Sequence, residues 1–361
     1  MEAPKLNPTY KANRNIRILL FIAVFVLIGI TALIMIRAAT TTIAVEVESG
    51  VISAGALKIN DSNASGGQVV QFANSLSPGW QLVWSDYFDN PTISATNWTK
   101  KQGTEGHSQA NYLTANVTYS GGKALIVTKR HCLSSTTEGL TDTNSNSSPC
   151  ALGKITKYSS GGIDTVNRWQ KGKIVIKAKL PVAQKGVWPA LWMRNSSGWC
   201  TANYGEIDIL EWYYDDRSSS TAPLILSTQR STAASHMTCV NNSTQKVQHY
   251  EDAVSDLTAI DHVWEVEWSN QGIKYKLDGT VVRTSSRTSP DGDNSIDIAQ
   301  DFGLSQQAFD TIMNQMWNIK INTQVIKSEP TGTQWHSAAN NSEVFNPVVF
   351  AIDSVEVFQM N

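Results

Sequence analysis

The chain has 361 residues, of which 41 % are hydrophobic and 17 % charged, so it is long enough for a sizeable core and is not an intrinsically disordered protein. Its formal net charge is −2, which gives no sign of a nucleic-acid binder. Residues 1–37 carry five basic and one acidic residue, and the 24 basic and 30 acidic residues of the rest give a net charge of −6, which favours a neutral substrate over a polyanion.

The first predicted element is an apolar run of 19 residues, 18–36, which carries no charge and is long enough to cross a bilayer as a helix. Arg14 and Arg17 precede it, so the positive-inside rule keeps residues 1–17 in the cytoplasm and exports the chain after Arg37. A cleaved signal peptide is the alternative, although its apolar core is usually only about 7 to 15 residues long. The sequence therefore predicts a membrane-anchored protein with an extracytoplasmic domain, secreted if the helix is cleaved.

Residues 37–77 are rich in Thr, Ser, Gly and Ala, a composition typical of a spacer. Within this segment, residues 45–72 alternate apolar and polar side chains as short strands do. The stretch is too short to close a β-sandwich of its own. We interpret it as a remnant or a stalk.

From residue 78 to residue 361 the pattern is all-β. Short alternating runs recur between Gly, Asn, Ser and Asp turns, for example at residues 124–129, 173–180, 265–268, 273–279 and 351–358. A Gly-Gly pair at Gly121 and Gly122 and an Asp-Gly pair at Asp278 and Gly279 predict hairpin turns, and residues 305–317 predict a helix. This regularity favours one large β-sandwich domain over two small domains.

Four cysteines lie in the predicted extracytoplasmic part: Cys132, Cys150, Cys200 and Cys239. None forms a Cys-x-x-Cys pair, which argues against a zinc site. An even number of cysteines in an exported chain favours disulfides. Three pairings are open to four cysteines, and free buried thiols are the alternative.

The most informative stretch holds three carboxylates within six residues, Glu206, Asp208 and Glu211. In a regular strand, Glu206 and Asp208 share one face, while Glu211 falls on the other face and enters the core. An unpaired buried carboxylate is costly. A β-bulge near Ile209 and Leu210 returns Glu211 to the acidic face, and bulges are common beside active sites. The sequence therefore predicts an irregular strand that presents three acids together.

Such a pair of carboxylates has a defined chemistry. Two carboxylates about 5 to 5.5 Å apart support a retaining displacement at a glycosidic carbon. One attacks the anomeric carbon, and the other protonates the leaving oxygen and then deprotonates the incoming water. Asp208 lies between them and helps to keep Glu211 protonated, because crowded carboxylates raise one another's pKa. For the acids alone, a solvated acidic strand face or a cation site is the alternative.

Two tryptophans, Trp188 and Trp192, come shortly before the acids. The face of an indole ring is a good platform for the C–H face of a sugar. Core packing is the alternative for any tryptophan, and it is the interpretation we prefer for Trp264 and Trp268.

Taken in order, these motifs resemble the laminarinase-type branch of glycoside hydrolase family 16. The acidic hexad and the preceding Gly205 are similar to the family's Gly-Glu-x-Asp-x-x-Glu signature, and residues 188–192 are similar to its Trp-Pro-Ala-x-Trp motif. Further similar segments occur at residues 80–90, 158–165, 171–181 and 351–359. The resemblance covers nearly all of the predicted extracytoplasmic domain.

The resemblance implies a β-jelly-roll sandwich of two curved antiparallel sheets with a concave substrate cleft. It implies a retaining, endo-acting hydrolase of β-1,3- or mixed-linked β-1,3/1,4-glucans that needs no cofactor. Glu206 is then the nucleophile, Asp208 the assisting acid and Glu211 the general acid/base. Four residues are expected to contact the glucan: Trp188, Trp192, Asn111 and Gln229. We expect the protein to be a monomer.

The chain also departs from the family pattern. The family's opening glutamate, which often helps to bind a structural calcium, is Tyr87 here, although Asp353 is kept, so a calcium ion is doubtful. A Glu and an Arg of the family appear as Val175 and Lys177. The strand after the acids often carries a cleft histidine, for which Gln229 is the nearest equivalent in the segment we assign to that strand.

Three alternatives remain open. A transglycosylase would form the same covalent intermediate and pass it to a sugar instead of water. A non-catalytic sugar-binding protein would have no reason to keep the three acids together. A structural surface protein fits the predicted anchor but not the combination of tryptophans and acids.

Overall fold

The computed structural model describes residues 56–60, 68–72, 79–106, 108–214, 229–240, 243–252, 257–286, 296–297, 304–327 and 338–360. The chain divides into two compact units, Met1–Leu76 and Ser77–Asn361. In the first unit, β1 (Ala56–Asn60) pairs antiparallel with β2 (Gln68–Phe72). The predicted membrane segment, 18–36, lies outside the described residues. Within the described part of the chain, no helix combines the length and apolar character that a membrane span needs.

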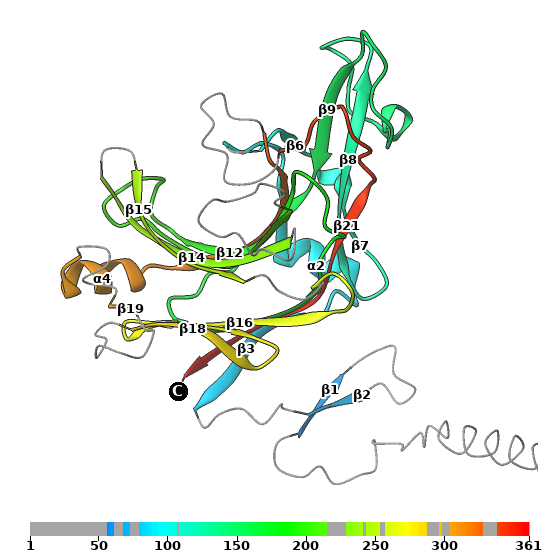
Figure 1. The fold of residues 1–361 in the computed structure, drawn as a ribbon. Coiled ribbons are helices and arrows are strands. Elements are labelled where there is room, and N and C mark those ends of the chain that lie inside the picture. The colour runs from blue at the N-terminus through cyan, green and yellow to red at the C-terminus, as the bar shows by residue number, and fades with distance from the viewer. Residues whose placement is uncertain are drawn as a thin grey trace, which may run out of the picture. The chain divides into compact units, whose positions relative to one another are not determined.

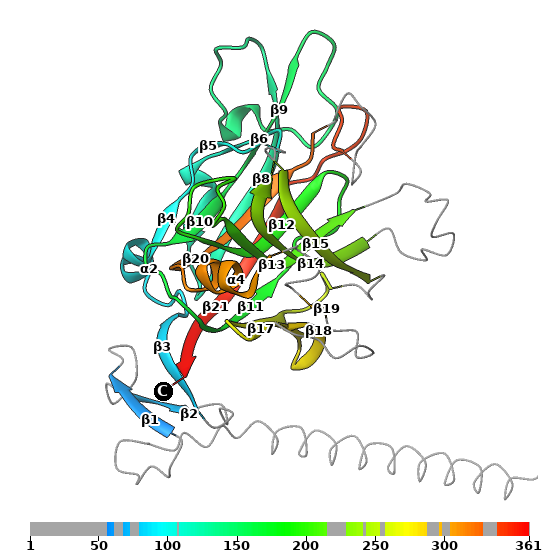
Figure 2. The same cartoon turned by 90° about the vertical axis from the view of Figure 1, so that its left-hand side faces the viewer.

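The second unit is a mostly antiparallel two-sheet sandwich (Figure 1). The smaller sheet has seven strands in the order β15-β14-β13-β12-β20-β10-β4. Their bounds are β4 (Trp98–Lys100), β10 (Gly162–Thr165), β12 (Val187–Asn195), β13 (Gly205–Tyr214), β14 (Gln229–Val240), β15 (Ser243–Asp252) and β20 (Trp317–Val325). Figure 2, turned by 90°, shows α4 (Gln306–Met313) lying beside β20 and β13.

The larger sheet runs in the order β19-β18-β17-β16-β11-β21-β8-β9-β6-β5, with β3 paired to β21 and β7 to β8. Its strands are β3 (Trp80–Asp86), β5 (Gly103–Thr104), β6 (Ala110–Tyr112), β7 (Val117–Tyr119), β8 (Ala124–Leu133), β9 (Ile155–Ser160), β11 (Gly172–Lys179), β16 (His262–Ser269), β17 (Gly272–Leu277), β18 (Thr280–Ser286), β19 (Ile296–Asp297) and β21 (Val348–Met360). A short helix, α2 (Pro91–Asn97), follows β3. All five of the alternating runs cited from the sequence are strands.

The two predicted hairpin turns are confirmed. Gly121 and Gly122 have φ values of 60° and 69° and join β7 to β8. Asp278 and Gly279 have φ values of 49° and 79° and join β17 to β18. Positive φ at both central residues is what a type I′ hairpin turn requires, and glycine adopts it without a steric cost.

The core lies between the sheets and follows from the alternation within each strand. Trp264, Val266 and Trp268 of β16 are all buried in it, which confirms core packing for these two tryptophans. The smaller sheet contributes alternate residues from the first part of β20, namely Trp317, Ile319 and Ile321. Because one face of each sheet is used for this packing, the opposite face is left for polar side chains.

The predicted helix at residues 305–317 is confirmed in a shorter form. Ser305 caps α4 by accepting a hydrogen bond from the Ala308 amide, and the helix ends at Met313. Trp317, predicted within the helix, instead begins β20. Its ring packs in the core together with Ile312 of the helix, so tertiary packing decides the boundary.

One disulfide links Cys132 to Cys150, with the two Cα atoms 5.3 Å apart. It closes the long connection between β8 and β9. Cys200 is also disulfide-bonded. The side chain of Cys239 lies outside the described residues.

Candidate active site

The acidic hexad lies in β13, and the strand is irregular where the sequence predicts it. Asp208 pairs with Trp192 of β12 and Leu210 pairs with Leu191, so Ile209 is an extra residue on this side of the strand. The register against β14 shifts at the same place. The β-bulge is therefore confirmed.

The bulge sorts the hexad onto two faces. Its three aliphatic side chains all pack into the core between the sheets. Glu206 and Glu211 are partly buried, and Asp208 is 5 % exposed. The acids therefore belong to the outer face of the smaller sheet. Figure 1 shows this sheet curved, with its hollow side turned away from the larger sheet.

Gly205 explains how the strand approaches the core just before Glu206. A Cβ atom added there would stand 2.6 Å from Trp317 and 2.8 Å from Ile312, and both of these side chains are fully buried. Only glycine allows β13 to lie this close to β20 and α4. The position of the Glu206 backbone thus depends on this absence of a side chain.

Neighbouring strands extend the acidic face into polar rows. Glu206, Asp208 and Glu211 pair with Arg194, Trp192 and Ala190 of β12. These three residues pair in turn with Asn318, Lys320 and Asn322 of β20. Directly paired residues share a face, so the rows run across the sheet from the acids.

Trp192 anchors a polar network in these rows. Its indole Nε1 donates a 2.6 Å hydrogen bond to Oδ1 of Asn322, whose Nδ2 donates a 2.8 Å bond to the hydroxyl of Tyr112. The ammonium groups of Lys101 and Lys320 lie 5.3 and 5.1 Å from the centre of the Trp192 ring. This is cation–π distance, and Trp192 is only 9 % exposed.

Both lysines are ion-paired. Lys101 binds Glu105, and Lys320 binds Asp164 on the adjacent strand β10. Glu105 also accepts a 3.0 Å hydrogen bond from the Tyr112 hydroxyl. Burial lowers the pKa of Lys320, the charge of Asp164 opposes that shift, and the nearby Lys101 adds to it. The network therefore balances two positive charges against two negative ones.

Tyr204 directly precedes β13 and is fully buried. Its hydroxyl donates a hydrogen bond to Oε2 of Glu206. Burial raises the pKa of the Tyr204 phenol, and the negative charge of Glu206 raises it further. Tyr204 and Arg194 were not identified from the sequence. The rule that residues two apart share a face of a strand was the available signal for Tyr204.

The other predicted substrate-binding residues lie in different places. Trp188 is partly exposed on β12, on the same face as Trp192 by the alternation of the strand. Asn111 lies on β6 next to Tyr112, and alternation turns it away from the network that Tyr112 joins. The structure thus brings Trp188 and Trp192 to the acidic face, and Tyr112 to their network.

Gln229 is the first residue of β14, where its backbone pairs with Tyr214 beyond the acids. The residue whose backbone stands opposite Glu206 is His236. The sequence interpretation missed His236 because it assigned the strand to residues 224–230, whereas β14 continues to Val240. Residues 224–228 lie outside the described part of the chain.

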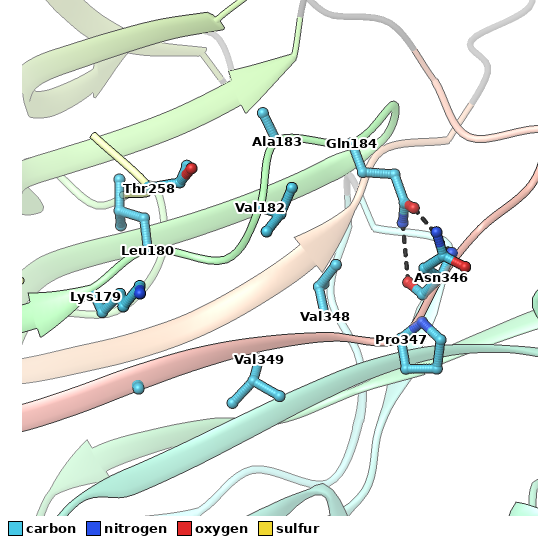
Figure 3. A pocket seen from close by; sticks show the side chains of 11 residues that line it. Lys179, Leu180, Val182, Ala183, Gln184, Thr258, Asn346, Pro347, Val348 and Val349 are labelled. Carbon is cyan, nitrogen blue, oxygen red and sulfur yellow. Dashed lines mark hydrogen bonds between the residues drawn. The ribbon is translucent and has the colours of Figure 1, made fainter. Parts of the chain in front are cut away.

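A cavity of about 580 Å³ lies elsewhere, where β11 ends and β21 begins (Figure 3). Its walls are mostly apolar, with Leu180, Val182 and Val349 among them. The side chain of Gln184 bonds the backbone of Asn346 at its rim. No carboxylate lines this cavity, so it does not have the chemistry of the acidic face.

A comparison with known families decides the classification of the chain. The family model described as "Glycosyl hydrolases family 16" matches residues 128–323, which is more than half of the chain and includes β12, β13 and most of β20. The chain belongs to this family. The resemblance stated from the sequence motifs is confirmed.

Named proteins and solved structures are also similar to this chain. A glucan endo-1,3-beta-glucosidase A1 from Niallia circulans is 28 % identical over 56 % of this chain and 29 % of its own length. A beta-glucanase from Rhodothermus marinus is 27 % identical over 57 % of this chain and 65 % of its own length. The chain thus spans less than two thirds of either relative. The laminarinase catalytic domain of Thermotoga maritima MSB8 covers 78 % of this chain and 100 % of its own, with 22 % identity and a TM-score of 0.54, which shows the shared fold.

The residues present do not fit the structural calcium that the family resemblance raised. Both carboxylate oxygens of Asp353 have ammonium partners, with Lys123 at 2.7 Å and Lys177 at 2.6 Å. Tyr87 donates a 2.5 Å hydrogen bond to Glu356. Two adjacent positive charges disfavour a divalent cation. Among the described residues, no cluster of three or more His, Cys, Asp or Glu side chains is arranged to hold a metal.

Proposed function

We propose that this protein is a retaining, endo-acting hydrolase of β-1,3- or β-1,3/1,4-glucans, with Glu206 as nucleophile and Glu211 as general acid/base. The observation that carries this proposal is the bulge at Ile209, because it returns Glu211 to the face that holds Glu206. Membership of family 16 supports glycosidic-bond hydrolysis. The names of the relatives, a glucan endo-1,3-beta-glucosidase and a beta-glucanase, support a β-glucan as substrate.

The spacing of the two acids along the strand permits the retaining mechanism. Their partners on β12, Arg194 and Ala190, are four residues apart, which corresponds to about 13 Å along the strand. Retention requires the carboxylates to lie about 5 to 5.5 Å apart. Each side chain then has to lean about 4 Å towards the other, within the length of a Glu side chain. A hollow sheet face favours this, because side chains on the inner side of a curve converge.

The reaction then proceeds in two steps. The Glu206 carboxylate attacks the anomeric carbon while Glu211 gives its proton to the departing glycosidic oxygen, which forms a glycosyl ester on Glu206. Glu211, now ionised, takes a proton from water, and the oxygen of that water attacks the same carbon and releases Glu206. Asp208, buried between the two, disfavours ionisation of Glu211 in the first step through its own charge.

The polar rows support the binding of a neutral chain. Trp192, Lys320 and Asp164 extend from Asp208 over three further strands. Strands lie about 4.8 Å apart, so the rows reach roughly 14 Å from the acids, which is long enough for more than one sugar unit. The ion pair of Lys320 and Asp164, whose side chains are partly exposed, offers donors and acceptors to sugar hydroxyls. An extended site of this kind suits cleavage within a chain, on the concave face of a jelly-roll sandwich.

We also propose that the enzyme is a monomer, requires no cofactor or calcium, and acts outside the cytoplasm, anchored by residues 18–36 or secreted. The disulfide between Cys132 and Cys150 supports the location, since such bonds persist in oxidising compartments. The glucan is then met outside the cell membrane.

The test is the release of reducing ends from laminarin and lichenan by the purified full chain. Glu206→Gln and Glu211→Gln are each expected to lower kcat at least about 1,000-fold without loss of fold. The matched control is Glu343→Gln, which removes an acid that pairs with Lys185 outside this site. Full activity of the Glu206→Gln protein would refute the proposal. Analysis of the products with added glucan acceptor separates hydrolysis from transglycosylation.

A further inference from the structure

The feature that the proposed reaction leaves unused is the buried phenol beside its nucleophile. Tyr204 stands two residues before Glu206, immediately ahead of β13. The Tyr204 hydroxyl donates a hydrogen bond to Oε2 of Glu206. A hydrogen bond from a buried phenol favours the ionised form of a carboxylate and fixes its orientation.

Tyr204 is held in place from several sides. The Arg194 guanidinium lies 5.4 Å from the centre of its ring, and the ring of Trp199 meets it edge-on with the centroids 5.1 Å apart. The Tyr204 amide donates a 3.1 Å hydrogen bond to the carbonyl of Thr201. These contacts fix the phenol before any substrate arrives, so the hydrogen bond to Glu206 is preorganised.

We propose that Tyr204 is a positioning residue for the nucleophile: its hydroxyl holds Oε2 of Glu206, so that Oε1 is the oxygen that attacks the anomeric carbon. This inference rests on the proposed function, because it assigns a partner to the nucleophile of that reaction.

The phenol acts in both steps without transferring a proton. Its pKa is raised by burial and by the charge of Glu206, so it stays protonated and only donates. A donor to the carboxylate favours the ionised form of Glu206, which is the form that attacks. In the glycosyl ester, Oε1 carries the sugar and Oε2 is the carbonyl oxygen, which still accepts the hydrogen bond. When water attacks the anomeric carbon and breaks its bond to Oε1, the phenol stabilises the Glu206 carboxylate that departs.

Other charged groups act on the ionisation of Glu206 as well. Arg194 faces it from β12 as its cross-strand partner. Asp208 and Glu211 lie on its own strand, and the backbone of His236 stands opposite on β14. Arg194 favours the ionised form and the two carboxylates disfavour it. Removing only the phenolic hydroxyl leaves all of these groups in place, which makes its own effect measurable.

The test compares Tyr204→Phe with Tyr158→Phe in the full chain. Tyr158, on β9 of the larger sheet, is a matched control because it is also buried. Its hydroxyl donates a hydrogen bond to the backbone carbonyl of Asn340 and not to an acid of the site. Loss of one hydrogen bond to a charged group is expected to lower kcat on laminarin about 10- to 100-fold, with KM nearly unchanged. The acid limb of the pH profile of kcat/KM should move up by about one pH unit, because Glu206 becomes easier to protonate without this hydrogen bond. Tyr158→Phe should leave both unchanged.

A second substrate separates the nucleophile from the acid. A dinitrophenyl β-glycoside of laminaribiose has a leaving group that needs no proton, so Glu211→Gln should still form the glycosyl ester at a rate near that of the parent. Tyr204→Phe should remain slow with this substrate, since its defect lies in the attack.

The outcomes are distinct. A Tyr204→Phe enzyme with the parent kcat and the parent acid limb overturns the role of Tyr204, while the loss of activity in Glu206→Gln keeps the proposed function. Full activity of Glu206→Gln overturns both. If the Tyr204→Phe protein melts at a much lower temperature than the parent, the Trp199→Leu protein is used as the test variant instead. Trp199 is 62 % exposed, and loosening its edge contact should shift the acid limb in the same direction by less. An unshifted limb there overturns the proposal.

Discussion

Replacing Gly205 by alanine tests the packing that places the nucleophile. The added Cβ would stand 2.6 Å from Trp317, 2.8 Å from Ile312 and 3.0 Å from the side-chain amide of Asn195. All three side chains are buried, so none moves without displacing others. The residue does not have a positive φ, so the penalty is steric alone.

Overpacking of this kind costs about 1 to 3 kcal/mol. For a domain of this size the melting temperature should fall by roughly 2 to 10 °C. If the strand shifts instead by about 1 Å, Glu206 moves with it, and kcat should fall by about two orders of magnitude. Differential scanning calorimetry and laminarin hydrolysis measure the two effects.

The matched control is Gly139→Ala, at an exposed position with no atom within 4 Å of the added Cβ. It should be neutral in both assays. A Gly205→Ala protein as stable and as active as Gly139→Ala would refute the steric reasoning.

Three further predictions concern the scaffold. Burial raises the pKa of Asp353, but the ammonium groups of Lys123 and Lys177 outweigh burial and hold this pKa below its usual 3.8. The ionised carboxylate therefore stabilises the fold above pH 3.8, and this stabilisation is lost as the pH falls through the lowered pKa. Asp353→Asn should lower the free energy of unfolding by at most about 1 kcal/mol at pH 7, because the paired groups are partly exposed, and should leave it unchanged near pH 2; urea denaturation measures both. A chelator should leave the melting temperature of the parent protein unchanged. A drop of several degrees would contradict the conclusion that these residues do not fit calcium. Replacing Cys132 and Cys150 by serine opens a loop with a sequence separation of 18 and should cost about 3 kcal/mol in the same assay, whereas unchanged stability would show that the connection is ordered without the disulfide.

The sequence predicts the irregular strand because burial of a carboxylate is costly. With strict alternation, Glu211 would enter the core, and only an extra residue avoids this. The same local logic predicts the two hairpin turns, since Gly-Gly and Asp-Gly pairs allow positive φ at both central residues. Features that depend on a few neighbouring residues can therefore be predicted from the sequence.

Contacts across the sheet are not readable in this way. Trp192 meets Asn322 and Lys320 only because β12 pairs with β20, more than a hundred residues later in the chain. Lys101 reaches the same ring through β4 and β10. No local pattern encodes these registers, so the network around Trp192 appears only in the fold.

Single-residue errors in strand position also matter. Tyr112, and not its neighbour Asn111, reaches the network, because adjacent residues of a strand point in opposite directions. His236 was missed for a related reason, since the apolar residues before Gln229 look like the strand itself. A shift of a few residues along a strand thus changes which side chain is assigned to the site.

The most direct measurement of the central claim is the anomeric configuration of the first product. Proton NMR of a fresh laminarin digest by the full chain should show the β-anomer appear first and convert slowly to the equilibrium mixture, because two displacements at one carbon restore its configuration. An α-anomer as the initial product would mean a single displacement by water, and Glu206 and Glu211 would then not act as nucleophile and acid/base on one face of β13.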